Sequence, residues 1–275
     1  MTIRNKSAVL WLALCVPCLG GCASFERHGS APSVPLAPDR RIVLNAHELR
    51  LHFANPSADS SRPLLVYATG DGGWHRKDLA VYRHLVSSGD PIVGFDAHDY
   101  VTHLGPNEAT TPGRLAADYG RIIQAARAAL NSPNRPIVLV GVSRGAGLSV
   151  VAAGQRALRP SISGVVAVAL TREEEYVKWF RRLRRRASRP TTPVIVEVYD
   201  YLPRLAGMPI AVIQSTRDTY LPAADARMLF GPDTPHRWFQ PIVARNHSFG
   251  GARPQLYQAV QRSLDWIQEL TTSAR

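Results

Sequence analysis

Short apolar runs alternate with amphipathic stretches along most of the chain. The runs with the length of buried strands are residues 63–68, 91–95, 137–140, 162–170, 209–214 and 238–243. Apolar residues recur at helical spacing within 111–130 and 254–270, and two shorter stretches, 42–44 and 49–53, suit an antiparallel edge pair. Strands that alternate with helices at these lengths predict an α/β domain with a doubly wound, mostly parallel sheet.

Residues that start and stop helices refine this prediction. A helix is expected at about 78–87, where Gly89 ends it. Thr111 can cap a further helix whose first turn accommodates Pro112. The length of 275 residues suits one α/β domain with a substantial core.

The first 21 residues have the pattern of a lipoprotein signal peptide. Arg4 and Lys6 form a basic start, and the apolar stretch 8–19 is too short to be a good membrane span. The string Leu-Gly-Gly-Cys that follows resembles the bacterial lipobox, so Cys22 is the predicted lipidation site. A plain secretory signal or an accidental cysteine is the alternative.

The remaining chain divides into a tether and a domain. Residues 22–40, with the lipidated cysteine and several prolines, are expected to be a flexible tether, and 41–275 the α/β domain. The other two cysteines, Cys15 and Cys18, lie in the segment to be removed, so the mature domain has neither a disulfide nor a thiol nucleophile. Ala23 after the lipidated cysteine favours the outer membrane and the periplasmic side of the envelope.

The strongly basic charge bears on partners. The formal net charge is +12, which predicts attraction to an anionic surface. For an exported protein, anionic phospholipid is a more suitable partner than nucleic acid. The sequence contains no nucleic-acid-binding motif and no internal repeat.

A nucleophile motif follows the apolar run at 137–140. The string Gly-Val-Ser-Arg-Gly at 141–145 fits Gly-x-Ser-x-Gly, in which a strand turns sharply into a helix. The two glycines are needed because a side chain at either position would collide with a neighbouring strand or helix. Ser143 is therefore the predicted nucleophile of an α/β-hydrolase, and an ordinary turn serine is the alternative.

A serine nucleophile needs a base and an orienting carboxylate, which follow the serine in the order acid, then histidine. Asp218 comes directly after the apolar run at 209–214, and His247 lies in a glycine-rich loop between the last strand and the last helix. These two residues are the predicted partners of Ser143. Asp200 and Asp225 are the rival carboxylates.

The oxyanion hole is expected to use two backbone amides. One is that of Arg144, which follows the nucleophile, and the other is that of Asp71 in the Gly-Asp-Gly-Gly loop after an earlier strand. A phosphate cradle is the other use of such a loop, but the Lys-Ser/Thr ending of a P-loop is missing. Asp96, at the end of the next strand, suits either a hydrogen bond within the site or a helix cap.

Several segments resemble the AcvB/VirJ family of bacterial virulence-associated proteins. They are residues 67–74, 78–79, 89–96, 111–112, 118, 141–146 and 246–249. The Gly-Asp-Gly-Gly-Trp string is the specific part, and the likeness extends over about 63–270. The resemblance implies an exported serine hydrolase that removes the aminoacyl group from lysyl- or alanyl-phosphatidylglycerol, with Ser143, Asp218 and His247 as its catalytic residues.

Two features depart from the family pattern. The elbow has Val142 and Arg144 where the family usually has an aromatic residue and a phenylalanine. The segment at about 171–193 joins three glutamates to a run of aromatic and basic residues, and it lies where α/β-hydrolases insert caps. Such a basic cap suits contact with an anionic bilayer, and its glutamates could meet an ammonium group. A solvated amphipathic helix is the alternative.

The sequence thus predicts a lipid-anchored serine esterase with no metal and no organic cofactor, and the family resemblance implies aminoacyl-phosphatidylglycerol as its substrate. A generic carboxylesterase or thioesterase is one alternative. A non-catalytic periplasmic accessory protein that binds virulence or secretion proteins is the other. The aminoacyl group and the oligomeric state do not follow from the sequence.

Overall fold

An eight-stranded sheet forms the centre of the described chain. The computed structural model describes residues 40–44, 47–55, 62–102, 111–175 and 195–273. The sheet strands are β1 (Arg40–Leu44), β2 (His47–Ala54), β3 (Leu64–Ala68), β4 (Ile92–Phe95), β5 (Ile137–Val142), β6 (Gly164–Val168), β9 (Ile210–Ser215) and β10 (Arg237–Ile242). Their order is β1-β2-β4-β3-β5-β6-β9-β10. β2 runs antiparallel to β1 and β4, whereas the other neighbours are parallel, so the predicted sheet is confirmed.

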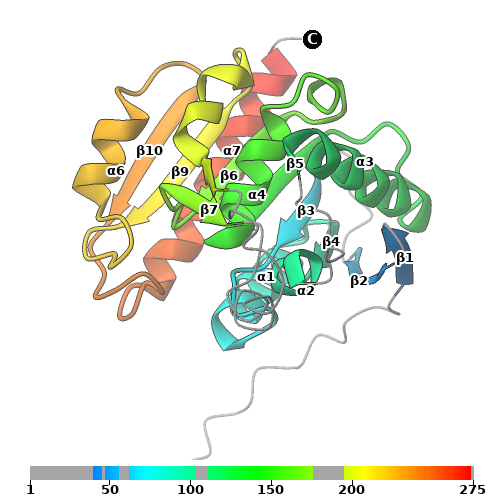
Figure 1. The fold of residues 1–275 in the computed structure, drawn as a ribbon, viewed down its shortest axis with the longest axis horizontal. Helices are drawn as coiled ribbons and strands as arrows, with labels where there is room; N and C mark the ends of the chain where they lie inside the picture. Colours follow the sequence, from blue (N-terminus) through cyan, green and yellow to red (C-terminus); the bar gives the residue numbers. More distant parts are fainter. Residues whose placement is uncertain (1–39, 45–46, 56–61, 103–110, 176–194, 274–275) are drawn as a thin grey trace, which may run out of the picture. The chain divides into compact units, whose positions relative to one another are not determined.

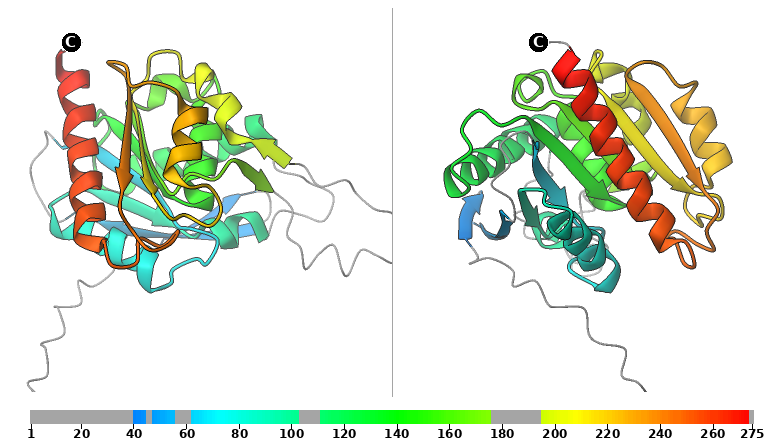
Figure 2. Two further views of the ribbon diagram at one scale, coloured as in Figure 1. Left: turned by 90° about the vertical axis from the view of Figure 1, so that its left-hand side faces the viewer. Right: turned by 180° about the vertical axis from the view of Figure 1, so that it is seen from behind.

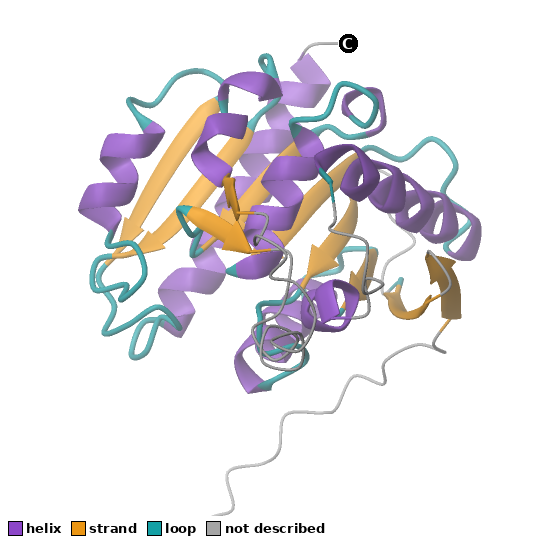
Figure 3. Ribbon diagram, in the orientation of Figure 1, coloured by secondary structure: helices purple, strands orange, loops and turns teal. Residues whose placement is uncertain are grey.

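Helices cover both faces of this sheet (Figures 1 and 3). They are α1 (Arg76–Ser87), α2 (Ala97–Thr102), α3 (Pro112–Ala129), α4 (Arg144–Ala153), α6 (Ala223–Phe230) and α7 (Arg253–Ser273). One apolar core joins the sheet to α2, α3, α4 and α6, and a second joins its other face to α1 and α7. α7 crosses the back of the sheet in Figure 2. The central strands are buried on both faces, as their continuous apolar runs require.

Local backbone chemistry explains where several elements begin and end. The hydroxyl of Thr111 accepts a hydrogen bond from the amide of Arg114 at 3.2 Å, so the predicted cap of α3 is confirmed. α1 begins at Arg76, two residues before the predicted start, and its N-cap residue His75 makes no side-chain capping bond. β6 ends at Val168 because Ala169 has a φ of 54°, which extended strands do not allow.

Two short strands form a second, smaller sheet. β7 (Glu173–Glu175) pairs antiparallel with β8 (Ile195–Glu197), and two short 3₁₀ turns, Val198–Tyr201 and Pro203–Leu205, follow. Of the cap predicted at about 171–193, only 171–175 are described. The predicted signal peptide, Cys22 and the tether as far as residue 39 also lie outside the described residues. None of the helices described here has the length and apolar character needed to span a membrane.

Candidate active site

The strand-to-helix turn at Ser143 has strained geometry. β5 ends at Val142 and α4 begins at Arg144, and Ser143 between them has φ 52° and ψ −117°. A Cβ atom on Gly141 would collide with the backbone of Gly145, and one on Gly145 would collide with the carbonyl groups after β3. Both glycines are therefore required by close backbone packing, which is the reason the sequence motif suggested.

Three side chains predicted from the sequence meet at the carboxyl edge of the sheet. His247 Nε2 lies 2.8 Å from Ser143 Oγ, and His247 Nδ1 lies 2.7 Å from Asp218 Oδ2. An imidazole with its proton on Nδ1 satisfies both contacts, because it donates to the carboxylate and accepts from the hydroxyl. Asp218 follows β9 and His247 follows β10, so the sheet order brings them to the elbow after β5.

The carboxylate of Asp218 is buried and held from several directions. Its Oδ1 accepts the amide of Tyr220 at 2.9 Å, and its Oδ2 accepts Gln214 Nε2 at 3.1 Å. The Gln214 amide group also donates to the carbonyl of Leu221 at 2.7 Å. Gln214 was not among the site residues predicted from the sequence, although a glutamine near the end of a buried strand was an available indication. The rival carboxylates, Asp200 and Asp225, are exposed.

The glycine-rich loop after β3 passes beside the nucleophile. A Cβ atom on Gly70 would lie 3.5 Å from Ser143 Cβ, and the Gly70 amide donates to Asp78 Oδ1 at 2.8 Å. Burial raises the pKa of the Asp78 carboxyl, and the Gly70 hydrogen bond opposes that rise. Asp78 thus fixes the start of the loop, a role that its predicted place at the beginning of a helix did not show.

The two residues predicted to form the oxyanion hole are in contact. Arg144 Nε donates to Asp71 Oδ1 at 2.7 Å, which ties the loop after β3 to the first residue of α4. Asp96 accepts the amide of Asp99 at 3.0 Å and so caps α2. Its carboxylate also lies against Gly73, where a Cβ atom would collide with it. Of the two roles considered for Asp96, the structure displays the helix cap.

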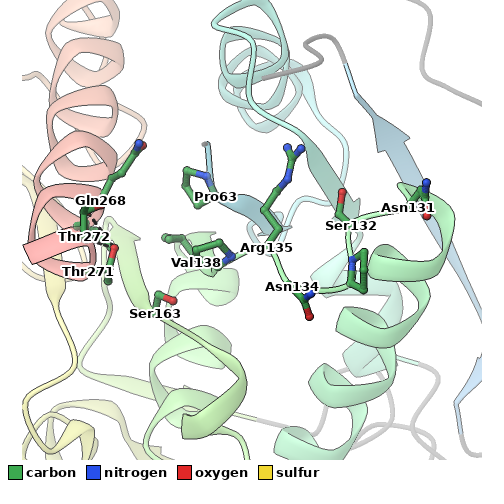
Figure 4. A pocket seen from close by; sticks show the side chains of 13 residues that line it. Pro63, Asn131, Ser132, Asn134, Arg135, Val138, Ser163, Gln268, Thr271 and Thr272 are labelled. Atoms are coloured by element: carbon green, nitrogen blue, oxygen red, sulfur yellow. Dashed lines mark hydrogen bonds between the residues drawn. The ribbon is translucent and has the colours of Figure 1, made fainter. Parts of the chain in front are cut away.

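A cavity of about 560 Å³ lies at the other end of the sheet (Figure 4). Pro63, Pro136 and Ser163 on its wall precede β3, β5 and β6, and Gln268 and Thr271 come from the last turns of α7. It therefore opens at the amino edge of the strands, away from Ser143. Within the described ranges, His, Cys, Asp and Glu side chains form no group of three that could hold a metal ion.

Residues 63–177 match the family model of the bacterial virulence protein VirJ. The predicted resemblance is therefore confirmed over this part. The matched segment runs from just before β3 to just after β7, so it includes Asp71, Ser143 and Arg144, and it ends before Asp218 and His247. No curated protein sequence matches the chain significantly.

Solved structures of α/β-hydrolases resemble the fold. Est1E from Butyrivibrio proteoclasticus has a TM-score of 0.60 at 14% identity, over 83% of this chain and 98% of its own. The esterase Pf2001 from Pyrococcus furiosus has a TM-score of 0.61 at 14% identity, and the match covers 84% of this chain and 92% of the esterase. A soluble variant of monoglyceride lipase from Saccharomyces cerevisiae, in complex with a substrate analogue, has a TM-score of 0.59 at 11% identity. That match covers 86% of this chain and 98% of the lipase. The fold of this chain is that of an α/β-hydrolase.

Proposed function

We propose that the protein is an exported serine esterase that hydrolyses the aminoacyl ester of lysyl- or alanyl-phosphatidylglycerol. The observation that carries the proposal is the hydrogen-bonded series Ser143–His247–Asp218 on a strained elbow. This arrangement is the one that activates a serine hydroxyl for acyl transfer. The VirJ match and the esterases among the similar structures support the same class of reaction.

Each group in the site has a step to perform in this reaction. Ser143 Oγ attacks the aminoacyl carbonyl while His247 Nε2 takes the hydroxyl proton. His247 then returns that proton to the glycerol oxygen as the ester bond breaks. Asp218 holds the imidazole and stabilises its charged form. We assign the stabilisation of the negative oxygen to the backbone amides of Arg144, the residue after the nucleophile, and Asp71. Water attacks the acyl-enzyme by the same route and releases the amino acid.

The rim of the site has features that suit an anionic membrane surface. Tyr220 is 72% exposed and stands with its ring centre 4.7 Å from that of His247. Val243, which directly follows β10, is 84% exposed. Arg217 and Arg245 lie exposed on the same two loops. Exposed aromatic and aliphatic side chains on loops that also carry exposed arginines favour contact with anionic phospholipid. We therefore propose that the protein acts at the membrane, anchored through Cys22 on the periplasmic side of the outer membrane.

Hydrolysis of the lipid itself tests the proposal. Residues 23–275 are incubated with vesicles that contain lysyl- or alanyl-phosphatidylglycerol, and the released amino acid and the deacylated lipid are measured by mass spectrometry. We expect equal amounts of the two products from the wild type and none from Ser143→Ala. Equal release by Ser143→Ala, with its folding confirmed by circular dichroism, would reject the mechanism.

A generic carboxylesterase is the second candidate. It is favoured by the esterase names among the similar structures and by Val142 and Arg144, which depart from the usual elbow of the family. The same preparation is compared on short acyl esters and on aminoacyl lipid at matched concentrations. A higher kcat/KM for the short esters favours this candidate, whereas a higher value for the lipid favours the aminoacyl esterase.

A further inference from the structure

The side chain of Arg144 links three segments around the nucleophile. Its Nε donates to Asp71 Oδ1 at 2.7 Å, and its Nη1 lies 3.3 Å from Glu174 Oε2. Asp71 belongs to the loop between β3 and α1, and Glu174 belongs to β7. The side chains of Arg144 and Glu174 are only 15% and 5% exposed, so solvent screens this ion pair less than it would screen a surface pair.

The Glu174 end of this linkage is closely fitted. The Glu174 side chain is buried, and Thr171 Oγ1 donates to its Oε1 at 2.6 Å. A Cβ atom on Gly147 of α4 would collide with Glu174 Cγ, so the absence of a side chain at Gly147 makes room for the carboxylate. Burial raises the pKa of Glu174, and the Arg144 guanidinium opposes that rise. The Arg144 guanidinium therefore stabilises the charged form of this carboxylate.

The Asp71 end is fixed from the other side by α2. His98 Nδ1 donates to the carbonyl oxygen of Asp71 at 2.5 Å, and its ring lies 3.7 Å from Asp71 Oδ1. The loop is thus held by α2 on one flank and by Arg144 on the other. Because Arg144 also follows the nucleophile directly, its side chain connects the two residues whose amides are proposed to bind the oxyanion.

We propose that Arg144 is a positioning residue, whose guanidinium holds the loop of Asp71 and the strand of Glu174 against the nucleophile elbow. This inference rests on the proposed esterase function. Oxyanion donors act only when they lie within hydrogen-bond distance of the developing charge. A small displacement of the Asp71 loop therefore reduces the stabilisation of the transition state more than it reduces the affinity for the substrate. Loss of the linkage is therefore expected to lower kcat and to leave KM nearly unchanged.

A double-mutant cycle on a soluble aryl ester tests the proposal. We expect Arg144→Met and Asp71→Asn each to lower kcat by about tenfold or more with KM changed by less than about twofold. The double variant should be no slower than Arg144→Met alone, because both changes remove the same contact. Arg144→Lys, which keeps the charge but not the fork, should recover part of the rate.

Two controls keep the outcomes distinct. Arg227→Met removes the exposed ion pair with Asp233 and should leave kcat and KM unchanged. Asp71 is largely exposed, so Asp71→Asn reports on the linkage even where Arg144→Met fails to fold. Additive losses in the double variant, or a rise in KM alone, would overturn the positioning role while the esterase stands. A folded wild type that hydrolyses no ester would overturn the proposed function and this inference with it.

Discussion

His247 Nε2 lies 2.8 Å from Ser143 Oγ, although 104 positions separate the two residues in the chain. Their loops follow β10 and β5, and β6 and β9 lie between these strands in the sheet. The contact therefore depends on a loop that reaches from the edge strand back to the central elbow. Phe249, buried within that loop with a φ of 53°, helps to hold this course.

Replacing the carboxylate of Asp218 should abolish most of the rate without unfolding the protein. In Asp218→Asn, the amide NH₂ would face His247 Nδ1 and favour the wrong tautomer of the imidazole. We expect kcat for ester hydrolysis to fall by about 10³- to 10⁴-fold. Asp225→Asn, at an exposed position on α6, is the matched control and should retain full activity. A large loss of kcat in Asp225→Asn with full activity in Asp218→Asn would instead assign the role of the acid to Asp225.

A side chain at Gly145 should prevent the elbow from forming. The added Cβ atom would collide with the carbonyl groups of Ala68 and Thr69, and neither backbone can move without displacing β3. We expect Gly145→Ala to lower the free energy of unfolding by about 2 kcal/mol or more and to remove activity, measured by urea denaturation and ester hydrolysis.

The matched control is another glycine in a helix. Gly113 in α3 has open space around the position of its Cβ atom, so Gly113→Ala should be neutral or should stabilise the protein by up to about 1 kcal/mol. Equal behaviour of the two alanine variants would show that the elbow has room that the structure does not display.

A negative charge on the rim should weaken membrane binding. Val243 is exposed and directly follows β10, four residues before His247. Met228 is exposed near the C-terminal end of α6 and serves as the comparison. We expect Val243→Glu to reduce sedimentation with anionic vesicles by about fivefold, and Met228→Glu to have a smaller effect. Hydrolysis of a soluble ester should be unchanged in both. Identical losses of vesicle binding in the two variants would argue against membrane contact through the rim of the active site.

The stability of the protein should contain a pH-dependent contribution from Asp90. Burial raises the pKa of this carboxyl from 3.8 to about 6, and Arg62, 3.2 Å away, opposes the rise without cancelling it. The folded state therefore binds more protons than the unfolded state between about pH 4 and 6, so this contribution falls as the pH rises through that window.

Urea denaturation of Asp90→Asn at pH 4 and at pH 8 checks this expectation. The variant cannot lose a proton, so its free energy of unfolding relative to the wild type should be more favourable at pH 8 than at pH 4. A difference that does not vary with pH would show that Asp90 is not the group responsible.

The sheet and the three predicted catalytic residues could be placed from the sequence, because each catalytic residue follows the end of a buried strand. A continuous apolar run marks each buried strand, and Ser143, Asp218 and His247 follow such runs directly or within a short loop. Parallel strands end at one edge of a sheet, so residues far apart in sequence could be assigned to one site. The boundaries of α1 were less accurate, because His75 caps that helix without a side-chain hydrogen bond.

Side-chain contacts between elements could not be predicted in this way. Arg144 meets Asp71 and Glu174 through long side chains from three different segments, and no periodicity in the sequence marks that meeting. Gln214 supports Asp218 through a buried amide whose partner depends on the turn after β9. Such contacts depend on rotamers and loop paths, which the alternation of apolar and polar residues does not specify.

The most direct test of the account is labelling of residues 23–275 with a fluorophosphonate probe, followed by peptide mass analysis. We expect one label, on Ser143, that disappears in His247→Ala because the hydroxyl then has no base. Absence of the label from folded wild-type protein, or labelling that persists unchanged in His247→Ala, would contradict an activated serine at this elbow.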